Sequence, residues 1–148
     1  MIKKLIFPVF YCLIFLSVSC GNRVDNIRVN GIAPMPDEIE GCACYLSIAD
    51  SSFNKGNFIF AASTDSVAYM RINEELVTLK RTSNTQYQFV FNEKSIVESY
   101  TNDEYNVSIT ALFEDSTSYQ SWKFNGALIV KSKTGNIKKM KFVGGCGC

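Results

Sequence analysis

Most of the chain from Cys42 onward alternates between apolar and polar side chains with a period of two. In one segment, Ala68, Met70 and Ile72 occupy every second position and so have the same parity, whereas the intervening Tyr69 has the opposite one. Because successive side chains of a strand point to opposite faces, this alternation predicts half-buried β-strands. The expected strands are Cys42–Ile48, Asn57–Ala62, Val67–Asn73, Leu76–Thr82, Gln86–Asn92, Glu104–Glu114, Tyr119–Lys131 and Ile137–Gly144.

Short segments rich in Asn, Asp, Gly and Ser separate these strands and are typical of turns. Regularly spaced short strands with tight turns predict an all-β domain over residues 42–148. We expect a single antiparallel meander of about eight strands, arranged as a small barrel or a sandwich. Only Glu93–Tyr100 could form a short helix. In its strand, Trp122 occupies the alternate positions of the apolar residues that are expected to form the core.

The first nineteen residues differ from the rest. Lys3 and Lys4 precede an unbroken apolar run, Leu5–Leu16, which ends in the small residues Ser17 and Ser19. This order is that of an export signal. The run is about 12 residues long, whereas a helix that spans a membrane needs about 20. Residues 1–19 are therefore interpreted as a signal peptide rather than a transmembrane anchor.

A cysteine follows the signal directly. The segment Leu16-Ser-Val-Ser-Cys20 resembles the bacterial lipobox, and that resemblance implies that Cys20 is acylated, as by palmitate. Ordinary signal-peptidase cleavage followed by secretion is the alternative. We expect the lipoprotein: lipid-anchored in the bacterial cell envelope, at the outer membrane, facing the periplasm or the cell surface. Residues 20–41 carry Asn, Gly and Pro without periodicity and are interpreted as a flexible, lipid-anchored tether.

Two Cys-x-Cys pairs bracket the domain. Each pair sends both sulfurs to one face of a strand, and antiparallel pairing of the first and last strands would place Cys42 opposite Cys148 and Cys44 opposite Cys146. An oxidising compartment favours disulfides among these four cysteines. A zinc or copper site built from Cys42, Cys44, Cys146 and Cys148 is the alternative, and an exposed redox thiol pair is a third interpretation.

The chain offers little for catalysis. It has no histidine, which excludes Ser-His-Asp and Cys-His arrangements. Its paired carboxylates, Glu74-Glu75, Asp103-Glu104 and Glu114-Asp115, lie at predicted turns. Removal of the signal peptide takes Lys3 and Lys4 with it and leaves 15 − 2 = 13 basic residues against 14 acidic ones. The sequence has no basic stripe with interleaved aromatic residues, which would indicate a nucleic-acid partner. We expect a protein that is not an enzyme and has no cofactor.

The tyrosines with outward parity, Tyr45, Tyr69 and Tyr119, are the candidate contact surface for a protein or glycan partner. The chain resembles a group of small bacterial lipoproteins of uncharacterised activity, which open with Cys-x-Cys-Tyr, here Cys42 to Tyr45, and end in Gly-Cys-Gly-Cys. It more distantly resembles the membrane-bound lysozyme inhibitors, lipid-anchored eight-stranded barrels, although their Ser-Gly-x-x-Tyr loop is not found here. The two functional hypotheses are a non-catalytic binding module and a metal-binding lipoprotein.

Overall fold

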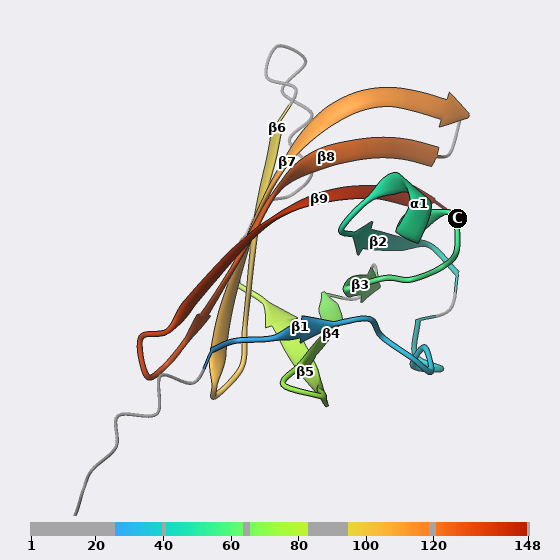
Figure 1. Cartoon of the computed structure of the whole chain (residues 1–148). Coiled ribbons are helices and arrows are strands. Elements are labelled where there is room, and N and C mark those ends of the chain that lie inside the picture. The colour runs from blue at the N-terminus through green and yellow to red at the C-terminus, as the bar shows by residue number, and fades with distance from the viewer. Residues whose placement is uncertain (1–25, 40, 64–65, 83–94, 119–120, 148) are drawn as a thin grey trace, which may run out of the picture.

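The alternating segments form strands that pair in sequence order around a closed barrel (Figure 1). The computed structural model describes residues 26–39, 41–63, 66–82, 95–118 and 121–147, and within them one antiparallel sheet contains all nine strands. The elements are β1 (Val29–Asn30), β2 (Ala43–Ser47), α1 (Asp50–Phe53), β3 (Phe60–Ser63), β4 (Val67–Ile72), β5 (Glu75–Arg81), β6 (Ser95–Thr101), β7 (Tyr105–Ser118), β8 (Ser121–Ser132) and β9 (Ile137–Gly147).

Each strand from β2 to β9 pairs with the next, and β9 pairs back with β2. The result is an eight-stranded up-and-down barrel, with the short β1 added alongside β4. Closure removes the exposed strand edges that an open sheet of this length would present to other chains. The predicted all-β meander is confirmed, and the barrel alternative is the correct one.

The barrel interior is filled by side chains of the predicted inward parity. Met70, Leu79, Val107, Leu128 and Val130 have no exposed surface. Phe60 and Tyr100 pack edge to face in the same core, with ring centroids 5.2 Å apart. Trp122 is partly buried against this cluster, as its parity predicted. Such dense packing leaves binding to the outer surface and the two ends.

Gly126 gives the long β7–β8–β9 ribbon room to curve. A Cβ at this position would overlap the Thr110 carbonyl oxygen and would lie only 2.9 Å from ring carbon Cζ of Phe142. The absent side chain therefore lets the buried Phe142 ring lie against the β8 backbone. Glycine in a strand interior often marks such a bend or close approach.

The middle of the chain forms a strand where a short helix was possible. The candidate helix Glu93–Tyr100 is wrong over its described residues 95–100, because Ser95–Thr101 is the strand β6, which pairs with β7 along its whole length. Glu98 has inward parity and hydrogen-bonds Tyr100, so a charged residue interrupts the apolar alternation and hides the strand signal. The predicted strand Gln86–Asn92 lies outside the described residues. The one-turn helix α1 was not predicted.

The second half of the predicted tether is not a tether. Ile27 is buried in the barrel core, and Ile32 and Ile39 are buried on the outside of the sheet. Residues 31–39, here called the strap, run across the outer face of β3 and β4. The Ile32 amide donates to the Phe58 carbonyl (2.7 Å), and the Arg71 guanidinium donates to the Ala33 carbonyl (2.8 Å). Three isoleucines spaced among Asn, Gly and Pro do not form a periodic pattern, so this packing could not be predicted from local alternation.

We predict that Gly126→Ala lowers the free energy of unfolding by about 1–3 kcal/mol, because an extra methyl group must displace backbone and the Phe142 ring. Gly31→Ala is the matched control, since a Cβ there meets nothing closer than 3.9 Å. Chemical denaturation of both variants measures the difference. Equal stability of the two variants would contradict the packing described for Gly126.

Candidate functional site

The first and last barrel strands are joined covalently. Cys44 of β2 lies directly opposite Cys146 of β9, with 4.0 Å between their Cα atoms, and the two sulfurs form a disulfide. The bridge links positions 102 residues apart. Both side chains point into the barrel, where Cys146 packs against the core. This confirms the predicted disulfide pairing of Cys44 with Cys146.

The other predicted cysteines are only partly covered by the structure. Cys42 is also disulfide-bonded. Its predicted partner Cys148 and the predicted lipidation site Cys20 lie outside the described residues. A sulfur in a disulfide is not a thiolate ligand, so Cys42, Cys44 and Cys146 in this state cannot form the metal site considered above. Among the described residues, no group of three histidine, cysteine or carboxylate side chains is placed to hold a metal ion.

An aromatic cluster lies on the outer face of the β2–β9 strand pair, next to the Cys44–Cys146 disulfide. Tyr45 follows Cys44 and points outward, as predicted, opposite Gly145. Its ring packs against Phe58, with centroids 4.6 Å apart, and Phe58 meets Phe53 of α1 edge to face at 5.4 Å. All three side chains are half-buried. Tyr45, Phe53 and Phe58 are called the aromatic patch below.

The two glycines before Cys146 make room on both faces of the barrel wall. A Cβ at Gly145 would lie 3.3 Å from ring carbon Cζ of Phe53, so the bare backbone accepts this ring. A Cβ at Gly144 would overlap the Leu46 side chain and lie 2.6 Å from the Tyr45 carbonyl oxygen. The Gly-Gly pair inside a strand was the available sequence signal for close approach here. Phe53 ends α1 and Phe58 precedes β3, and the role of these two rings was not predicted.

The predicted contact surface must be corrected for Tyr69. Its side chain does point away from the barrel interior, but only 8% of the residue is exposed. The strap residues Ile32 and Ile39 cover it, together with the partly buried Met35. Burial, followed by the Glu38 charge, raises the pKa of the Tyr69 hydroxyl. Outward parity in an isolated strand did not reveal that another segment lies over it. Tyr119 lies outside the described residues.

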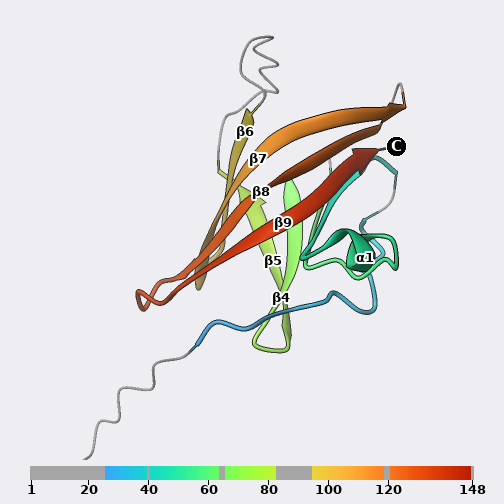
Figure 2. The same ribbon diagram turned by 45° about the horizontal axis from the view of Figure 1, so that its top comes forward.

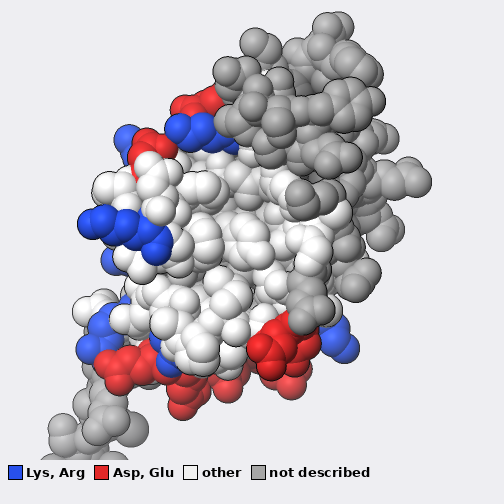
Figure 3. Space-filling view, turned by 90° about the vertical axis from the view of Figure 1, so that its right-hand side faces the viewer, with Lys and Arg blue, Asp and Glu red and all other residues white. Residues whose placement is uncertain are grey.

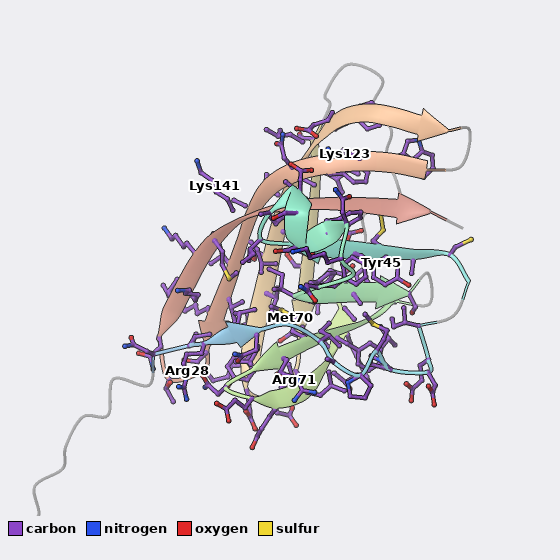
Figure 4. The ribbon with its side chains drawn as sticks, turned by 45° about the vertical axis from the view of Figure 1, so that its right-hand side comes forward. Arg28, Tyr45, Met70, Arg71, Lys123 and Lys141 are labelled. Carbon is purple, nitrogen blue, oxygen red and sulfur yellow. A yellow bond between two sulfur atoms is a disulfide. The ribbon has the colours of Figure 1, made fainter. Side chains whose placement is uncertain are left out.

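Charged side chains lie around the aromatic patch rather than within it. Figure 3 views the molecule from the side of β2 and α1, and uncharged side chains fill the centre of this face. An ion pair at α1 joins Lys123 Nζ to Asp50 Oδ1 at 2.9 Å, which ties the short helix to β8. The hydrogen bond with Asp50 raises the pKa of the Lys123 amine. Figure 4 shows Tyr45 on this side of the molecule.

A second group of polar side chains lies inside the barrel wall. Tyr100 Oη donates to Glu98 Oε2 at 2.6 Å, and Arg81 donates to Tyr100 Oη from Nε and from one terminal nitrogen, each at 3.3 Å. The Arg81 and Glu98 side chains are 12% and 16% exposed, and their charges lie 3.7 Å apart. The three side chains satisfy one another, so we interpret this group as structural support for β5 and β6.

Comparison with known protein families, with curated proteins and with solved structures gives no match for this chain. Its function must therefore be argued from the residues. Within the part of the chain that the structure describes, no helix has the length and apolar character needed to span a membrane.

The Tyr100 cluster predicts a pH dependence. Burial, followed by the Glu98 carboxylate, raises the pKa of the Tyr100 hydroxyl above its ordinary value of 10.0. The folded state thus holds its proton while the unfolded state releases it. This contribution to stability is complete below pH 10 and is lost as the pH rises from 10 toward the folded-state pKa, by about 1.4 kcal/mol per pH unit.

Tyr100→Phe removes this titration. Above pH 10, the unfolding free energy of the variant should therefore fall less steeply with pH than that of the unsubstituted protein, by the slope that corresponds to one proton. Urea denaturation at a series of pH values from 8 to 11 measures both slopes. Parallel slopes would show that Tyr100 ionises normally in the folded protein.

Proposed function

We propose that this protein is an exported lipoprotein, anchored to a membrane through acylated Cys20, whose non-catalytic barrel binds a protein partner through the aromatic patch. The observation that carries the binding proposal is the patch itself: three half-buried aromatic side chains packed against one another on the outside of the barrel. The expected location is the bacterial cell envelope.

Export and anchoring are supported by two independent features. The order of charges, apolar run and small residues before Cys20 is that of a lipoprotein signal. The Cys44–Cys146 disulfide is a bond that persists in oxidising compartments, such as those reached by export. A reducing cytosol would not favour a barrel that is closed in this way.

The composition of the patch supports a binding role. Tyrosine and phenylalanine are enriched at protein interfaces because they bury a large apolar area with few rotatable bonds. Exposed apolar side chains elsewhere on the described surface, such as Leu76 and Ile137, are not accompanied by a comparable aromatic group. Gly145 seats Phe53 against the barrel wall, so the patch is held by a rigid strand pair.

The geometry of the rings favours a protein over a glycan. Sugars stack on exposed, open ring faces. Here the Tyr45 and Phe58 rings lie against each other at an interplanar angle of 31°, and Phe53 meets Phe58 at 70°. Much of each ring face is therefore used within the patch. The remaining edges and half-exposed surfaces suit apolar side chains of a partner protein.

The anchor is tested with Cys20→Ala. We expect the unsubstituted protein in the membrane fraction, with a mass that begins at Cys20 and includes acyl groups. The variant should be released into the soluble fraction with its barrel folded, because Cys20 lies outside the described residues that build the barrel. A soluble, unacylated wild-type protein would refute the proposed anchor.

The partner surface is tested by photo-crosslinking in intact cells. Benzoylphenylalanine replaces Tyr45 or Phe53 in turn, because an aromatic reagent preserves the packing of these positions. We expect a discrete crosslinked species of higher mass at both. Leu76 and Leu112, which are 43% and 50% exposed and lie outside the patch, are matched control positions. The same crosslinks at all four positions, or none at Tyr45 and Phe53, would contradict the proposed partner surface.

A further inference from the structure

A group of lysines lies at the end of the barrel where the chain enters. The hairpin of β8 and β9 contains five lysines and no acidic residue between positions 131 and 141. All five side chains are exposed. In Figures 1 and 2 the first described residues, which lead into β1, lie beside the tip of this hairpin. The lysines are Lys131, Lys133, Lys138, Lys139 and Lys141.

The chain length between the proposed anchor and the barrel is short. Ile27 is buried in the barrel core, and its 27 − 20 = 7 residue steps from Cys20 reach at most about 25 Å when fully extended. If Cys20 is acylated, the end of the barrel that holds Ile27 must stay within that distance of the lipid headgroups. This is the same end that carries the β8–β9 hairpin.

We propose that the β8–β9 hairpin docks on anionic phospholipid headgroups and so fixes the orientation of the anchored barrel. This inference rests on the proposed lipidation of Cys20. Lysines near a membrane surface are attracted to phosphate groups, and each adds to the total. Ile137 lies among them with 55% of its surface exposed, and an apolar side chain between lysines suits the headgroup boundary.

Acidic residues lie at the same end of the barrel. Glu74 lies in the β4–β5 turn, Glu75 begins β5, and Asp103 and Glu104 lie in the β6–β7 turn. Arg71 donates to the Glu74 carbonyl and the Lys133 amide donates to the Glu104 carbonyl, so these turns carry mixed charge, whereas the hairpin carries lysines without an acidic residue between positions 131 and 141. An anionic surface attracts the hairpin more strongly than these turns, which inclines the barrel toward its β8–β9 side.

The orientation leaves the aromatic patch accessible. Figure 4 shows Lys141 and Arg28 on the left of the molecule and Tyr45 on the right. The patch lies against Gly145, toward the end of β9 that is remote from the hairpin tip. The docking surface and the partner surface are thus separate and can be occupied together.

The test uses the full-length protein purified from membranes, placed on vesicles of phosphatidylcholine alone or with one third phosphatidylglycerol. Lysine side chains are acetylated with a water-soluble, amine-reactive reagent, and the extent of acetylation at each lysine is measured by peptide mass spectrometry. We expect acetylation of the five hairpin lysines to fall about threefold or more on the anionic vesicles, while Lys55 and Lys80 are unchanged. About 1 M salt should restore it, because the Debye length is then about 3 Å.

Matched variants separate docking from general charge. Lys139→Gln with Lys141→Gln should abolish the protection of the remaining hairpin lysines, whereas Lys55→Gln with Lys80→Gln should retain it. Equal acetylation of the hairpin on both vesicle types, in a protein that stays bound to neutral vesicles through its acyl groups, would overturn the docking inference alone. A protein without acyl groups that washes off neutral vesicles would overturn the anchor and this inference with it.

Discussion

The pairing of β2 with β9 is the interaction on which the rest of the structure depends. Among the described strands, this pairing joins the first and last strands of the barrel meander, and the Cys44–Cys146 disulfide fixes its register. A strand register that slipped by one residue would turn every side chain to the opposite face. Leu46 would then leave the core and Tyr45 would enter it. A crosslink over 102 residues also removes much of the freedom of the unfolded chain.

The same strand pair connects the fold to the proposed function. On its inner face, Gly144 admits Leu46, and on its outer face, Gly145 admits Phe53. The closely packed strand pair around the disulfide thus presents Tyr45, Phe53 and Phe58 from a fixed support. Exposed aromatic side chains on a flexible loop would lose more entropy on binding than those of a rigid strand. The lysine-rich hairpin lies at the other end of β9, so one strand links the partner surface to the membrane surface.

Much of the fold could be predicted because period-two alternation is strong in β4, β7, β8 and β9, where one face is core. The Cys44–Cys146 pair was expected from parity, from an oxidising compartment and from an assumed pairing of the first and last strands, which the structure shows. The sequence failed where a local pattern is overridden by distant contacts. The strand β6 was missed because the charged Glu98 occupies an inward position and breaks the apolar alternation. Its partners, Tyr100 of β6 and Arg81 of β5, also occupy inward positions, and this pairing cannot be seen in the local pattern. Tyr69 is outward yet buried, because the strap covers it through residues that have no periodicity.

The most direct test of this account is the oxidation state of the four domain cysteines in protein purified without reductant. The protein is unfolded in the presence of an alkylating reagent, before and after reduction, and the peptides that contain Cys42, Cys44, Cys146 and Cys148 are weighed. The account predicts no alkylated cysteine before reduction and four afterwards. Four reactive thiols in the unreduced protein, or a metal ion released with them on unfolding, would contradict covalent closure of the barrel and favour the metal-binding alternative.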